Sequence, residues 1–168
     1  MRSRIVSIWC LRNPEDARRY EDVISSLTKA SSTQAFQPHL TLGSLSQRSD
    51  LSGLIKTGFS LAPLELDGNA VFTTSLFVRF KASEPLIRAR QTLEQNLSFR
   101  PGRVFDPHIS LHYGPPPCEA TKSKQVSALL DHPVRFDRLA AIEMEVPIED
   151  PSALLTWRTL DTYELDGL

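Results

Sequence analysis

The chain has 168 residues, of which 40% are apolar, and it carries a formal net charge of −1 and two cysteines. This length suits a single domain over 1–168, and the near-zero charge provides no basic field for a long nucleic acid. The apolar runs are too short to span a bilayer, and two cysteines without paired spacing define neither a disulfide framework nor a zinc site. We therefore expect an intracellular, cytoplasmic protein that is not bound to a membrane, and we take it to be a monomer.

The first half of the chain predicts alternating strands and helices. Residues 3–10 are typical of a short buried strand, and Asn13 before Pro14 is typical of a helix start with Asn13 as the N-cap. Apolar residues at helical spacing give this helix a core-facing stripe, which the polar run at 31–34 ends. The later elements expected in this half are a strand at 39–42, a short helix over 50–57 and a strand over 60–66.

The second half repeats this order. We expect a strand over 71–80, a helix from Pro85 to about Leu97, a strand at 108–111, a helix over 121–132 and two final paired strands at 134–146 and 154–165. Strand, helix, strand, helix and strand therefore occur in each half. This order predicts an α+β fold of two pseudo-symmetric lobes, each an antiparallel sheet flanked by helices, around a central cleft.

The strongest signal is a repeated heptad. Phe-Gln-Pro-His-Leu-Thr-Leu, centred on His39, recurs as Phe-Asp-Pro-His-Ile-Ser-Leu, centred on His108, 69 residues later. Ordinary composition predicts about 0.1 chance matches to the pattern His-apolar-hydroxyl-apolar. Because side chains alternate along a strand, His39 shares a face with Thr41, and His108 shares one with Ser110. Two imidazoles and two hydroxyls presented in this way indicate an acid–base site.

The two tetrads resemble the paired His-x-Thr/Ser-x signature of the 2H phosphoesterases, whose fold is LigT-like. The chain is most similar to the eukaryotic cyclic phosphodiesterase branch of that superfamily. The resemblance covers nearly the whole chain and includes a strand that ends in Trp9, Tyr113 shortly after the second tetrad, and a Trp-x-x-x strand at 157–160. The chain departs from the branch because it lacks the disulfide cysteines of some relatives, and because His112 stands where an apolar residue is common.

The resemblance implies a hydrolase that uses neither a metal nor a cofactor. Its expected substrates are small cyclic phosphates, namely 2′,3′-cyclic nucleotides and/or ADP-ribose 1″,2″-cyclic phosphate, which are by-products of tRNA splicing, and its expected product is a 2′-phosphomonoester. We provisionally assign His108 as the base that activates water and His39 as the acid that protonates the leaving oxygen. The pseudo-symmetry leaves that polarity open. The hydroxyls of Thr41 and Ser110 are expected to bind the non-bridging oxygens.

Two aromatic residues complete the expected substrate site. Trp9, at a strand end, can stack on a nucleobase or serve as a core aromatic, and the sequence favours neither role. Tyr113, close behind the second tetrad, is expected to close the pocket or to bind phosphate.

Three other interpretations use the same residues. A metallohydrolase site would combine His39, His108 and His112, but the last two lie about 13 Å apart on an extended strand, so one ion would need a bulge between them. A non-catalytic nucleotide-binding module would use the same cleft without chemistry. A 2H phosphodiesterase or ligase acting on RNA ends would need a local basic groove.

Overall fold

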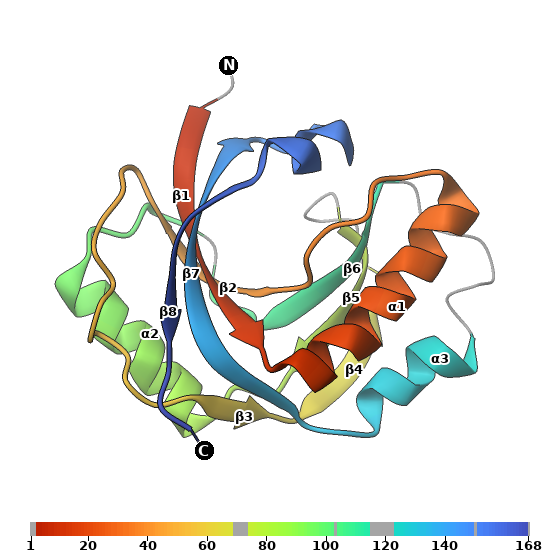
Figure 1. Ribbon diagram of the computed structural model, residues 1–168, viewed down its shortest axis with the longest axis horizontal. Helices are drawn as coiled ribbons and strands as arrows, with labels where there is room; N and C mark the ends of the chain where they lie inside the picture. Colours follow the sequence, from red (N-terminus) through yellow and green to blue (C-terminus); the bar gives the residue numbers. More distant parts are fainter. Residues whose placement is uncertain (1–2, 69–73, 103, 115–122, 150, 168) are drawn as a thin grey trace.

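The computed structural model describes residues 3–68, 74–102, 104–114, 123–149 and 151–167 (Figure 1). Among these residues, two long helices and three short helical segments interrupt the series of strands. In order they are β1 (Ser3–Arg12), α1 (Pro14–Ser31), β2 (Leu40–Leu45), β3 (Phe59–Leu61), β4 (Pro63–Asp67), β5 (Thr74–Phe80), α2 (Glu84–Asn96), β6 (His108–Tyr113), α3 (Lys124–Ser127), the 3₁₀ turn η3 (Ala128–Leu130), β7 (Val134–Val146), η4 (Pro151–Thr156) and β8 (Arg158–Glu164).

The eight strands of the described residues form one antiparallel sheet, which is bent into two lobes. Its order is β3-β7-β1-β2-β6-β5-β4, with β8 added alongside β7. The first lobe is β3, β7, β8, β1 and β2, and the second is β6, β5 and β4. The two lobes join where β2 meets β6, through the single pair Leu40 and Ile109. The expected α+β, two-lobed architecture is confirmed, and the lobes interleave, because β7 and β8 lie with β1, β2 and β3 of the first half of the chain, whereas β4 lies with β5 and β6 of the second half.

The two long helices cover one face of this sheet. Tyr20, Val23 and Ile24 of α1 and Leu86 and Leu93 of α2 share one core cluster with inward-facing strand residues. Helix α1 packs against β6 as well as β1, whereas α2 lies beside the first lobe (Figure 1). Helix α1 therefore supports a strand in each lobe. The site described below lies on the face of the sheet opposite the helices.

Both helix starts follow from their capping residues. The Asn13 side chain accepts a hydrogen bond from the backbone of Asp16 at 2.9 Å, and the Ser83 hydroxyl accepts one from Leu86 at 3.4 Å. Each cap is followed by Pro at one of the first two helical positions, where its missing N–H removes no helical hydrogen bond. Both predicted N-termini are therefore confirmed.

Strand β1 divides the core into two clusters by its alternation. Ile8 and Cys10 face the helices and belong to the main core. Trp9 and Leu11 point to the other face, where they pack with Ala140 and neighbouring apolar residues of β7. This second cluster supports the floor of the site described below.

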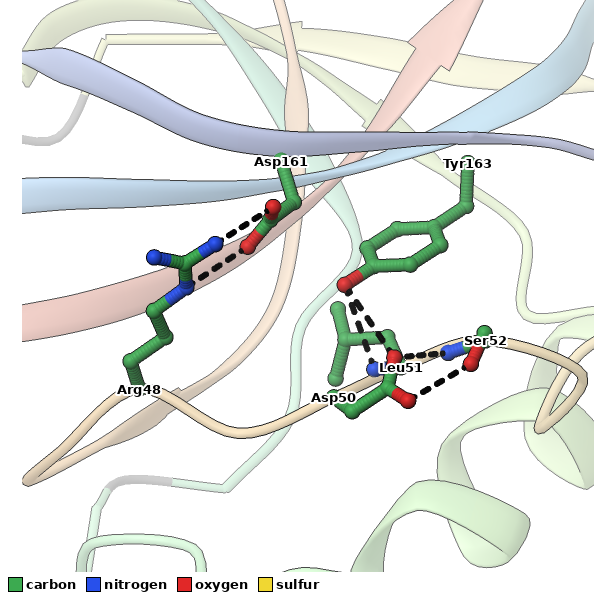
Figure 2. A network of polar contacts seen from close by, with 6 residues as sticks. All are labelled: Arg48, Asp50, Leu51, Ser52, Asp161 and Tyr163. Carbon is green, nitrogen blue, oxygen red and sulfur yellow. Dashed lines mark hydrogen bonds and ion pairs between the residues drawn. The ribbon is translucent and has the colours of Figure 1, made fainter.

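The short helix expected over 50–57 is not formed. The Asp50 carboxylate accepts hydrogen bonds from the backbone and hydroxyl of Ser52 at 2.9 and 2.7 Å, and Gly53 has a φ of +70°. Such a local side-chain hydrogen bond offers the backbone an alternative to a helix, and the positive φ of Gly53 lies outside the helical region, so turns form instead. Figure 2 shows how the segment is held on β8: the Tyr163 hydroxyl meets Asp50 and the backbone of Leu51.

The same loop is also held on β8 by an ion pair just before these turns. Arg48 donates two hydrogen bonds to Asp161, at 2.9 and 2.7 Å (Figure 2).

Three other predicted elements differ in extent. The strand expected over 60–66 is two strands, because the chain leaves β7 after Leu61 and pairs with β5 from Pro63 onward. The helix expected over 121–132 is reduced to α3 and η3, with 121–122 outside the described residues. The last strand begins only at Arg158, since η4 precedes it. The first residues of the strand expected over 71–80 lie outside the described residues.

In the part of the chain that the structure describes, no helix combines the length and the apolar character needed to cross a membrane.

Candidate active site

The two histidines of the repeated heptad lie on neighbouring strands and line one cavity. His39 immediately precedes β2, and His108 is the first residue of β6. The cavity has a volume of about 890 Å³, and Thr41, Ser110 and Tyr113 line it as well. The structure therefore brings together five of the six residues that the sequence assigns to the site.

Each histidine is anchored in the same way by the residue two positions before it. Nδ1 of His39 donates to the carbonyl of Gln37 at 2.8 Å, and Nδ1 of His108 donates to the carbonyl of Asp106 at 2.7 Å. A carbonyl can only accept, so Nδ1 carries the proton in both rings. Proton exchange with a ligand then falls to Nε2, which is a base in the neutral ring and an acid in the charged one.

His39 is enclosed by aromatic rings. Only 6% of it is exposed, its ring stacks on Trp9 with centroids 3.5 Å apart and planes within 8°, and Trp157 meets it edge-on at 5.3 Å. Burial lowers the pKa of His39 from its ordinary value of 6.5 to about 3, against the opposing effect of the hydrogen bond to Gln37. The imidazole of the ligand-free protein is therefore neutral at physiological pH.

Trp9 supports His39 and does not line the cavity. The indole is 1% exposed, with its face against the imidazole and its Nε1 donating to the Ser7 hydroxyl at 3.0 Å. Of the two roles that the sequence left open for Trp9, this position fits the core aromatic, because the strand alternation turns the indole into the second core cluster, where the His39 ring covers it.

A buried arginine that the sequence did not single out holds the loop before His39. Arg12 is 2% exposed, donates from Nη2 to the carbonyl of Pro38 at 2.9 Å, and lies 4.3 Å over the ring of Tyr20. Burial lowers its pKa to about 10, so the guanidinium stays charged at neutral pH. Its position is visible in the sequence only as a charge at the end of an apolar strand.

A second arginine holds the loop before His108. Arg79 lies opposite His108 in the β5–β6 register, and its Nε donates to both carboxylate oxygens of Asp106 at 3.1 Å. The same guanidinium pairs with Glu65 at 2.7 Å and Asp67 at 2.9 Å on β4. Arg79 is thus a clamp between β4 and Asp106, whose backbone carbonyl accepts the hydrogen bond from Nδ1 of His108.

An irregularity in β6 decides which side chains reach the cavity. Ser110 pairs with Phe77 and His112 with Leu76, so two steps along β6 match a single step along β5. After this bulge Tyr113 lines the cavity together with Ser110. Regular alternation would have placed His112 on that face.

His112 instead contacts the end of α1. Its Nε2 lies 2.7 Å from the Ser31 hydroxyl and 3.1 Å from that of Thr33, and the residue is fully buried. Burial lowers the pKa of this ring too. No group of three or more His, Cys, Asp or Glu side chains among the described residues is arranged to hold a metal ion.

The two hydroxyls of the tetrads differ in exposure. Thr41 is exposed at the cavity surface, whereas Ser110 is 5% exposed in its wall. Tyr113 is also buried except for its cavity edge, and Phe36 packs against its ring at 4.8 Å. The site therefore presents two imidazoles, two hydroxyls and one phenol to the same space.

Solved structures share this architecture. The crystal structure of E. coli LigT complexed with 3′-AMP aligns over 96% of this chain and 98% of its own, with a TM-score of 0.58 and 16% identity. The NADP⁺ complex of E. coli LigT aligns over 98% and 99%, with a TM-score of 0.57 and 15% identity. A crystal structure described as a phosphoesterase aligns over 97% and 98%, with a TM-score of 0.59 and 15% identity.

The chain therefore has the α+β, LigT-like fold that the sequence predicts. No protein-family model matches the sequence, and no curated protein sequence matches it either.

Proposed function

We propose that the chain is a 2H phosphoesterase that hydrolyses small cyclic phosphodiesters by two-histidine acid–base catalysis, without a metal or a cofactor. The observation that carries the proposal is that His39 and His108 line one cavity, each with Nδ1 donating to a carbonyl, so that Nε2 is the nitrogen that exchanges a proton with a ligand. The hydroxyls of Thr41 and Ser110 lie in the same cavity, where a phosphate would need donors. The LigT-like fold supports the same chemistry.

The burial of His39 suggests which histidine is the base. Hydrolysis needs one neutral imidazole to take a proton from water and one charged imidazole to give a proton to the leaving oxygen. Because burial favours the neutral form of His39, this ring is in the protonation state that the base needs, and the role of the acid then falls to His108. This polarity is the reverse of our provisional assignment from the sequence.

The reaction then balances as follows for a 2′,3′-cyclic phosphate. Nε2 of His39 takes a proton as the water oxygen bonds to phosphorus, and the bond from phosphorus to O3′ breaks. Nε2 of His108 gives its proton to O3′, which leaves a 2′-phosphomonoester and a 3′-hydroxyl. Thr41 and Ser110 donate hydrogen bonds to the non-bridging oxygens, whose charge grows in the transition state. A second proton exchange with water restores both rings.

The substrates we propose are 2′,3′-cyclic nucleotides and/or ADP-ribose 1″,2″-cyclic phosphate, as in the cyclic phosphodiesterase branch. Two of the aligned LigT structures are complexes with the nucleotides 3′-AMP and NADP⁺, which supports a nucleotide ligand for a cavity of this fold. A cyclic-phosphate-ended RNA is the alternative substrate.

The first experiment assays adenosine 2′,3′-cyclic phosphate, ADP-ribose 1″,2″-cyclic phosphate and a cyclic-phosphate-ended oligonucleotide in the presence of EDTA. We expect the wild type to release phosphomonoesters, and His39→Ala and His108→Ala each to lower kcat by about 10²–10⁴. His132→Ala, at an exposed site away from the cavity, is the control. An undiminished kcat in either active-site variant, or wild-type turnover abolished by EDTA, would contradict the proposal.

A second assay decides the polarity. A substrate with sulfur in place of the leaving O3′ needs little help from an acid, because a thiolate leaves without protonation. We expect this substrate to restore much of the rate of His108→Ala and little of the rate of His39→Ala. If this substrate restores the rate of His39→Ala but not that of His108→Ala, then His39 is the acid and His108 the base, as first assigned from the sequence.

A further inference from the structure

The cavity continues past the two histidines along one wall. Beyond Thr41 it is lined by β2 residues up to Ser44 and by the segment between α2 and β6, including Phe99, Arg100 and Phe105. Since the four tetrad residues are only a minority of those that line this space, the remaining wall is available to a part of the ligand that does not react.

This wall is firmly built from aromatic rings. A Cβ on Gly43 would lie 2.3 Å from Cε2 of Phe99, so the absence of a side chain at Gly43 is what lets the ring lie against β2. The guanidinium of Arg90 lies 4.3 Å over the ring of Phe105 and donates to the carbonyl of Leu42 at 3.0 Å. Arg90 therefore acts as a scaffold for the wall.

Arg100 differs from Arg90 in its charge environment. Arg90 pairs with Glu94 at 2.7 Å, so these two cavity-lining charges neutralise each other. The guanidinium of Arg100 has no hydrogen-bond or ion-pair partner among the described residues, although the residue is half-buried in the wall. Its backbone is fixed, because its N–H donates to the carbonyl of Ser44 at 2.8 Å. A fixed, half-buried cation without a counter-charge favours an anionic ligand.

We propose that Arg100 binds a second phosphate of the substrate, separated by one sugar from the phosphorus held between the histidines. This inference rests on the proposed function and extends it, because it selects nucleotides with a 5′-phosphate or pyrophosphate over cyclic nucleosides without one. Ser44 lies three residues beyond Thr41, about 10 Å along the strand. That separation leaves room for a ribose between the two anions, with a base beside the Phe99 and Phe105 wall.

The test compares adenosine 2′,3′-cyclic phosphate with and without a 5′-phosphate, and a 5′-pyrophosphate form separates the two sources of negative charge. We expect kcat/KM of the wild type to be about five- to tenfold higher for the 5′-phosphorylated substrate, mainly through KM. In Arg100→Gln this ratio falls to about one, and in Arg100→Lys it is partly kept. Arg88→Gln, on the exposed side of α2 outside the cavity, keeps the wild-type ratio. Equal kcat/KM for the two substrates in the wild type overturns the proposal.

A binding measurement separates this proposal from the catalytic one. Calorimetric titration of the wild type with adenosine 3′,5′-bisphosphate and with adenosine 3′-monophosphate needs no turnover. Tighter binding of the bisphosphate, lost in Arg100→Gln, supports the subsite even if no cyclic phosphate is hydrolysed. Equal affinities for the two ligands overturn it, whatever the outcome of the kinetic assays.

Discussion

The burial of His39 predicts that the protein becomes less stable as the pH falls through the range in which an ordinary histidine titrates. The folded ring has a pKa of about 3, whereas an unfolded one has a value of about 6.5. Between these values the unfolded chain binds a proton that the folded protein does not, so unfolding is favoured as the pH is lowered. The stabilisation is present above pH 6.5 and is lost progressively toward pH 3.

The size of this effect follows from the two pKa values. Lowering the pH from 7.5 to 5 reduces the contribution of His39 to the free energy of unfolding by about 2 kcal/mol. His112, whose pKa burial also lowers, changes stability in the same direction. A comparison of the wild type with His39→Asn isolates His39, because both proteins retain His112, and the Asn amide can still donate to the Gln37 carbonyl.

Urea unfolding at several pH values measures the difference. We expect the free energy of unfolding of His39→Asn to fall by about 2 kcal/mol less than that of the wild type over this pH range. His132→Asn, which removes an exposed histidine, retains the wild-type pH dependence. If His39→Asn and the wild type show the same slope, His39 is not neutralised by burial, and the base assignment based on it fails as well.

Three further predictions concern packing, capping and positioning. Gly43→Ala forces a Cβ against the Phe99 ring and should lower the free energy of unfolding by about 1–3 kcal/mol in urea titrations; an unchanged value would show that the ring moves aside without strain. Asn13→Ala removes the cap of α1 and should lower the free energy of unfolding by about 1 kcal/mol in the same measurement, whereas Asn13→Ser should retain most of the wild-type value. If the two variants lose the same free energy of unfolding, Asn13 does not act as a cap. Arg79→Gln releases Asp106 and should lower kcat about tenfold, while the free energy of unfolding changes by less than about 1 kcal/mol. An unchanged kcat would show that Arg79 does not position His108.

Local chemistry explains which elements could be predicted. Asn13 and Ser83 cap their helices by contacting residues only three positions further along the chain, so both partners can be recognised in the local sequence. The predicted bounds of β7 match the structure, because prolines stand on both sides of it. The segment at 50–57 contained the opposing signal as well, since an Asx turn at Asp50 competes with a helix, but its anchor on Tyr163 lies more than a hundred residues away.

The candidate site also contains features that the sequence could predict and features that it could not. The repeated heptad places His39 and His108 in one cavity because each tetrad carries its own strand geometry and its own carbonyl anchor. The role of Arg12 could not be predicted, since its partners are a carbonyl 26 residues further on and a ring on α1. The position of Tyr113 depends on a bulge that only pairing with β5 creates.

The interleaving of the lobes has a consequence for synthesis. Strand β1 is complete at Arg12, yet it pairs along nearly its whole length with β7, which begins at Val134. At ordinary elongation rates roughly 6 to 25 s pass before that partner has been made. During this time the edge of β1 that pairs with β7 in the finished protein is open, and such edges associate with other chains. The same pairing that closes the sheet beside His39 therefore gives the growing chain an interval in which an apolar strand lacks its partner.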